Sequence, residues 1–153
     1  MSKSPGTADQ GIDGPTTFHR GRLRADAESA GQARGEFSLW LHDRFAFSST
    51  GCSDIVLAVN EALANAAEHA YATALGAGSV DVDACYDADH QFLRVIVEDR
   101  GLWRRPRPAG ALPATRGRGI PLMRALADDT TIDTTSEGTR VSMSWGQLHL
   151  LQT

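Results

Sequence analysis

The strand patterns of this chain come in consecutive pairs with no helix between them, which limits the folds that it can adopt. Val80, Val82 and Ala84 alternate with polar residues, and a polar segment at 87–90 leads into a second alternating run at 92–98. Alternation predicts strands with one buried face, and the short polar segment predicts a hairpin. Strands are predicted near 18–23, 80–85, 92–98, 130–135 and 139–145.

Three segments have the spacing of apolar residues that is typical of helices. The first covers 25–45, and Asp26 is its candidate N-cap. The second runs from about 53 to 72. The third covers 120–128 and has Pro121 in its first turn, where the missing N–H costs nothing. The predicted core positions of the second helix are Val56, Val59, Leu63, Ala66 and Ala70.

The order of these elements predicts the fold class. Two helices, a hairpin, a helix and a second hairpin favour an α+β two-layer sandwich: a mixed, mainly antiparallel sheet with helices on one face. Strands and helices do not alternate, so a Rossmann fold is not expected. We expect a disordered leader at 1–17, a folded domain at 18–147 and a tail at 148–153.

Composition excludes several classes of function. The 153 residues suit one domain, and the net charge of -4 gives no overall basic field for nucleic acid or anionic lipid. No apolar run approaches the ~18 residues of a membrane span. Cys52 and Cys85 form no metal-binding pair, and free thiols are typical of a reducing compartment. We therefore expect a cytoplasmic protein that binds neither nucleic acid nor membrane.

One helical turn separates Glu61 from Asn65, so their side chains share a face. In one interpretation, Glu61, Asn65 and Glu68 form the solvated side of an amphipathic helix. In another, the amide oxygen of Asn65 binds Mg²⁺, which prefers oxygen ligands. Glu61 could then accept a proton from an attacking hydroxyl or water. The residues alone leave both interpretations open.

Asp99 and Gly101 follow the first hairpin directly. They are typical of a turn that ends a strand. Alternatively, Asp99 is a buried carboxylate that accepts a hydrogen bond from an exocyclic amine such as that of adenine. Gly101 would then let the backbone pass close to a flat ring.

Two further glycine-containing segments have an ordinary and a functional interpretation. Gly117 and Gly119 precede a helix, where they could form a hinge or expose backbone N–H groups to a phosphate. Gly138 and Thr139 open the last strand, as a hairpin turn or as a contact with a nucleotide.

Taken in order, these segments resemble the conserved boxes of the GHKL superfamily of ATPases and kinases. The segment 56–71 resembles the N box, 97–101 the first glycine box, 117–123 the second glycine box, and 138–139 the final nucleotide contact. The N-box match through 65–71 is similar to the anti-sigma factor serine/threonine kinase branch in particular. The resemblance covers about 26–145 and implies the Bergerat, or histidine-kinase-like ATPase, fold.

The resemblance also implies a role for each residue. Asn65 would coordinate Mg²⁺, and Glu61 would be the catalytic base. Asp99 would bind the adenine amino group, with support from Thr139 through water. The positions that would admit the nucleotide and its phosphates are Gly101, Gly117, Arg118 and Gly119.

The function implied is that of an ATP-dependent serine/threonine protein kinase acting as an anti-sigma factor. Its cofactors would be ATP and Mg²⁺. Its partners would be a sigma factor and an anti-sigma factor antagonist with a STAS domain, and the resemblance suggests a homodimer. The alternative is a non-catalytic module that binds nucleotide weakly or not at all and regulates a partner.

Overall fold

A computed structural model describes residues 13–24, 26–47, 51–72, 79–99, 116–135 and 138–151 of the chain, with the backbone alone for 68–72, 116–119 and 135. The elements are β1 (Thr17–Arg24), α1 (Ala27–Arg44), β2 (Phe45–Ala46), α2 (Gly51–Ala72), β3 (Ser79–Asp87), β4 (Phe92–Asp99), α3 (Arg116–Leu126), β5 (Asp129–Thr135), β6 (Gly138–Trp145) and β7 (His149–Leu150).

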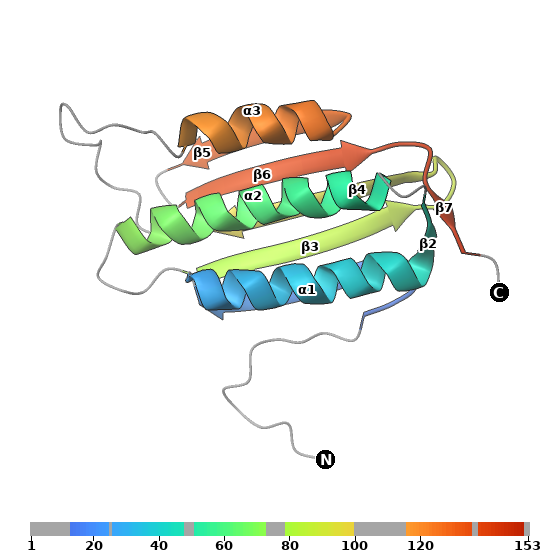
Figure 1. Ribbon diagram of the computed structural model, residues 1–153, viewed down its shortest axis with the longest axis horizontal. Coiled ribbons are helices and arrows are strands. Elements are labelled where there is room, and N and C mark those ends of the chain that lie inside the picture. The colour runs from blue at the N-terminus through green and yellow to red at the C-terminus, as the bar shows by residue number, and fades with distance from the viewer. Residues whose placement is uncertain are drawn as a thin grey trace, which may run out of the picture.

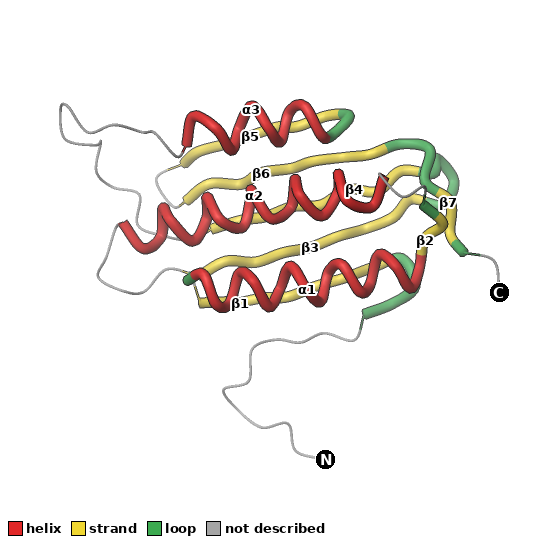
Figure 2. Tube along the Cα trace, in the orientation of Figure 1, coloured by secondary structure: helices red, strands yellow, loops and turns green. Residues whose placement is uncertain are grey.

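The described strands form a five-stranded sheet and a two-stranded sheet. The order in the larger sheet is β1-β3-β4-β6-β5, and its neighbours all pair antiparallel. The three helices lie on one face of this sheet (Figure 1, Figure 2). This confirms the α+β two-layer sandwich. β2 and β7 pair at one end, so part of the predicted tail forms a strand.

The core lies between the helices and the sheet. Val80, Val82 and Ala84 of β3 are buried, as the alternation predicts. The inward residues of β4 and β6 are buried in the same way: Leu93, Val95, Val97, Val141, Met143 and Trp145. Burial of this apolar surface stabilises the contact between the two layers.

The buried face of α2 is broader than predicted. Val59, Leu63 and Ala66 are buried, whereas Val56 is only partly buried. Additional buried positions are Cys52, Ile55, Ala58, Ala62, Asn65 and Ala67. The helix lies between α1 and α3 in the helical layer (Figure 1), so its two sides are covered as well as the side that faces the sheet.

The third helix begins earlier than predicted. α3 starts at Arg116 rather than Ile120, so Pro121 lies inside the helix and not in its first turn. The proline nitrogen cannot donate to the carbonyl of residue 117, which removes one helical hydrogen bond. Packing offsets this cost, because Met123 is completely buried and Ile120 packs against the core.

Asp26 is the N-cap of α1, as the sequence predicts. Its carboxylate accepts a hydrogen bond of 2.7 Å from the backbone N–H of Ser29, which lowers the pKa of Asp26 from its ordinary 3.8. The cap therefore contributes stability above the unfolded-state pKa, and this contribution is lost as the pH falls through the lower folded-state pKa.

The variant Asp26→Asn should consequently show a flatter acid profile of thermal stability. Asparagine caps helices about as well as aspartate does but does not titrate. We expect the melting temperature of the wild type to fall more steeply than that of the variant below pH ~4. Parallel curves from calorimetry between pH 2 and 6 would contradict this assignment.

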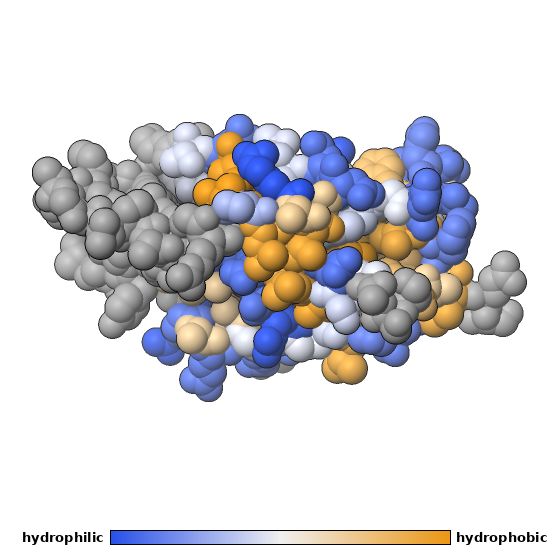
Figure 3. All heavy atoms as spheres, turned by 45° about the horizontal axis from the view of Figure 1, so that its top comes forward, coloured by the Kyte–Doolittle hydropathy of each residue, from blue (hydrophilic) through white to orange (hydrophobic). Residues whose placement is uncertain are grey.

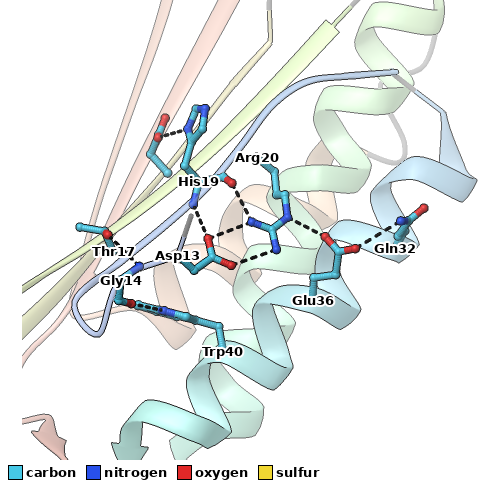
Figure 4. Close-up of polar contacts among 9 residues, drawn as sticks. Asp13, Gly14, Thr17, His19, Arg20, Gln32, Glu36 and Trp40 are labelled. Carbon is cyan, nitrogen blue, oxygen red and sulfur yellow. Dashed lines mark hydrogen bonds and ion pairs between the residues drawn. The ribbon is translucent and has the colours of Figure 1, made fainter. Parts of the chain in front are cut away.

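Polar contacts hold residues 13–16 against β1 and α1 (Figure 4). The guanidinium of Arg20 makes two hydrogen bonds to Asp13, of 2.9 and 3.0 Å, and one of 2.6 Å to Glu36. The indole N–H of Trp40 donates to the carbonyl of Gly14 at 3.0 Å. These contacts hold the segment that leads into the edge strand β1. This segment lies at the end of the molecule where β2 and β7 pair.

Both cysteines are free, Cys52 buried and Cys85 exposed. Burial raises the pKa of the Cys52 thiol, so it stays protonated at neutral pH.

No described helix has the length and hydrophobicity needed to cross a membrane. Figure 3 shows apolar surface gathered in the middle of the view. Among the described side chains of α1 and α2, Leu39 and Leu57 are the large exposed apolar ones.

Candidate functional site

A cavity of about 190 Å³ lies between the helical layer and the sheet. Its walls come from α2, α3, β4, β5 and β6, and most of them are apolar. The apolar lining residues are Ala62, Ala66, Val97, Ile120, Met123, Ile132 and Val141. The polar ones are Asn65, Asp99, Thr134 and Thr139. A mostly apolar cavity with a few convergent polar groups is typical of a small-molecule site.

Asp99 is the last residue of β4 and is only 3% exposed. Its Oδ1 accepts a long hydrogen bond of 3.4 Å from the backbone N–H of Thr139. A buried carboxylate is costly unless donors surround it, and ionised it can only accept. Because Asp99 also lines the cavity, it suits a ligand that presents an N–H donor.

Gly138 makes the position of Asp99 possible. The backbone of β6 approaches β4 so closely there that a Cβ on Gly138 would lie 1.9 Å from the carbonyl oxygen of Asp99. Its φ of +153° is also one that L side chains rarely adopt. The hairpin interpretation and the site interpretation of this glycine are therefore compatible, since Gly138 lies at the β5–β6 turn and also against Asp99 of β4.

The hydroxyl oxygen of Thr139 is buried and has no hydrogen-bond partner within the described part of the chain. Buried polar atoms are nearly always hydrogen-bonded, and leaving one without a partner costs about 1–3 kcal/mol. Thr139 lies directly opposite Asp99 across the β4–β6 ladder and lines the same cavity. Its hydroxyl is thus suited to a ligand atom or a bound water at the carboxylate.

Asn65 extends from α2 into the cavity and is 8% exposed. The solvated-face interpretation is wrong for this residue, because Asn65 lies on the side of α2 that faces the cavity, with Ala62 and Ala66. Glu61 lies one turn earlier on the same helix. It is partly buried and is not one of the residues that line the cavity.

The glycines predicted to face phosphates lie at the start of α3. The backbone of residues 116–119 forms its first turn, and Ile120, next in the chain, lines the cavity. Exposed N–H groups at a helix start are suited to binding an anion. α3 thus reaches the cavity wall at Ile120, one residue after this glycine-containing turn, whereas Gly101 lies outside the described residues.

The sequence interpretation missed the cavity residues of β5. Ile132 and Thr134 alternate on the inward face of this strand and line the cavity. Alternation in the predicted strand could have placed them on one face. The prediction would also have needed the β4–β6 pairing, which places this hairpin beside Asp99.

The residues present fit the base of a nucleotide. The cavity is smaller than the roughly 300–1,000 Å³ that encloses a whole drug-sized ligand, so it suits one flat ring system. A carboxylate, an unpartnered buried hydroxyl and an amide surround apolar walls, which match the polar edge and apolar faces of an aminopurine. Asn65 also lines the cavity, and its side-chain amide offers the kind of oxygen ligand that would hold Mg²⁺.

Comparison with a family model identifies the domain type. The model described as the histidine kinase-like ATPase domain matches residues 23–145. This range covers most of the chain and includes the cavity, Glu61 and the start of α3.

Two solved structures are similar to this chain. A structure of the RsbU and RsbW domains of Rv1364c from Mycobacterium tuberculosis has 26% sequence identity and a TM-score of 0.65, covering 87% of this chain and 33% of that chain. This chain therefore spans about a third of that protein's structure. The histidine kinase domain of the blue-light activated kinase EL346 from Erythrobacter litoralis has 20% identity and a TM-score of 0.51, covering 89% of this chain and 70% of that chain. The latter likeness concerns the fold alone.

Proposed function

Since the chain belongs to the histidine kinase-like ATPase domain family, we propose that it is an ATP-dependent serine/threonine protein kinase that acts as an anti-sigma factor. The observation that carries nucleotide binding is the cavity in which Asp99, Thr139 and Asn65 converge. The anti-sigma assignment is supported by the N-box resemblance and by the likeness to a structure with an RsbW domain.

The residues that hold the nucleotide divide between its two ends. Asp99 accepts a hydrogen bond from the exocyclic amine of adenine, and Thr139 supports this contact through a bound water. Asn65 would hold Mg²⁺ through its amide oxygen. At the phosphate end, backbone N–H groups at Gly117 and Gly119 and the guanidinium of Arg118 bind the phosphate oxygens, and Gly101 admits the nucleotide.

Mg·ATP supplies the γ-phosphoryl group and the cation that neutralises its charge. Glu61 accepts the proton of a serine or threonine hydroxyl on a STAS-domain antagonist. The hydroxyl oxygen forms the new bond to phosphorus as the bond to the β–γ bridging oxygen breaks. Phosphorylation of the antagonist would change which partner the protein holds, the sigma factor or the antagonist.

The variant Glu61→Gln tests this proposal. We expect it to bind Mg·ATP with unchanged affinity, because Glu61 does not line the cavity. Transfer of radiolabel from ATP to a STAS-domain protein of the same host should fall by about 100-fold or more, the usual contribution of a general base. Glu98→Gln, on the uncovered face of the sheet, is the matched control and should transfer normally.

Equal labelling by wild type and Glu61→Gln would remove Glu61 as the base. The alternative is a non-catalytic regulatory module, which needs the nucleotide site but no catalytic base. Calorimetric binding of Mg·ATP without labelling of any STAS-domain protein would support that module instead.

A further inference from the structure

Three polar side chains form a row on the sheet side of the cavity, from the buried Asp99 at its floor to the exposed Thr134 at its rim. Thr134 of β5 pairs directly with Thr139 of β6, and Thr139 pairs directly with Asp99 of β4. Residues opposite each other in antiparallel strands share a face, with Cβ atoms about 4.5–5.5 Å apart. All three also line the cavity. The row therefore presents a hydroxyl, a second hydroxyl and a carboxylate to whatever the cavity holds.

The threonines on the inward face of β5 differ in their partners. The hydroxyl of Thr130 donates to the carbonyl of Met123 at 3.4 Å and so helps to hold α3 against the strand. No hydrogen bond within the described ranges joins the hydroxyl of Thr134 to another residue. Thr134 is exposed and lines the cavity, so it lies at the rim, where a ligand can reach its side chain.

We propose that Thr134 is a further base-binding residue, whose hydroxyl contacts the aminopurine that Asp99 holds, directly or through one water. This inference rests on the proposed nucleotide binding. A carboxylate can serve only the donors of such a base, whereas the ring nitrogens of adenine are acceptors. A hydroxyl can donate, so Thr134 supplies at the rim what Asp99 cannot supply at the floor.

The test compares variants of one strand by titration calorimetry with Mg·ATP and with ADP. Thr134→Val has nearly the same shape but no hydroxyl, and should raise the Kd of both nucleotides by roughly 3- to 10-fold, as the loss of one net hydrogen bond predicts. Thr134→Ser keeps the hydroxyl and should bind within about 2-fold of wild type. Thr131→Val, on the opposite face of β5, is the matched control and should bind as wild type does.

Each other result has a definite meaning. Wild-type affinity of Thr134→Val for both nucleotides would overturn the role of Thr134 and leave nucleotide binding intact. A loss confined to ATP would overturn the base contact, because ADP carries the same base. An equal loss in Thr134→Ser would overturn the role of the hydroxyl. Absence of binding by the wild type would overturn this inference together with the proposed function.

Discussion

Asp99→Asn is expected to weaken the binding of Mg·ATP by roughly 10- to 100-fold. Hydrogen bonds to charged groups contribute about 1.5–3 kcal/mol, and 1.4 kcal/mol corresponds to a factor of ten in Kd. Asparagine is nearly isosteric with aspartate but carries no charge, and only one of its two terminal atoms can accept a hydrogen bond. The carboxylate is 3% exposed, so water cannot replace the lost acceptor.

Titration calorimetry of the two proteins measures this effect. Asp133→Asn is the matched control, because Asp133 is exposed and pairs with Arg140 on the uncovered face of the sheet. It should bind with the affinity of the wild type. Should Asp99→Asn bind equally tightly while remaining folded, the cavity would not be the adenine site.

Gly138→Ala is expected to have the largest effect on stability. The added Cβ would lie 1.9 Å from the carbonyl oxygen and 3.2 Å from the Oδ1 of Asp99, so β6 and β4 would have to separate. Overpacking of this kind typically costs about 1–3 kcal/mol, and the φ of +153° adds backbone strain. The shift would also move Asp99 and Thr139, so nucleotide binding should fall as well.

Urea unfolding of Gly138→Ala and of a matched glycine variant checks this expectation. Gly35→Ala in α1 is the control, because a Cβ there meets nothing within 4 Å. In a helix this change should stabilise the protein by about 0.5–1 kcal/mol. Unfolding of Gly138→Ala at the wild-type midpoint would mean that the two strands can separate there without cost.

The sequence predicts the fold well because its strand signals are local. Apolar and polar residues alternate over 80–84, and polar turn residues separate the strands of each hairpin, so neighbouring strands could be paired without knowledge of distant contacts. The N-cap at Asp26 is equally local. In each case the structure confirms a pattern contained within a few residues.

Predictions that depend on contacts between distant segments were less complete. The pairing of β2 with β7 joins residues more than a hundred positions apart, each strand being too short to show a pattern. Asn65 is buried only because α2 packs between α1 and α3 and against the sheet. Pro121 is tolerated inside α3 because Met123 anchors that helix in the core. The roles assigned to the site residues stay predictions, those of Asn65, Asp99 and Thr139 as much as those of Glu61, Arg118 and the glycines.

The polar row of the cavity depends on the pairing of β4, β5 and β6 rather than on any loop. Successive residues of a strand point to opposite faces, so a shift of one position would turn Thr134, Thr139 or Asp99 away from the helices. A single-residue insertion or deletion within these strands would therefore abolish the site while leaving every one of its side chains in the chain. Length variation among natural homologues should accordingly be absent from these three strands wherever nucleotide binding persists.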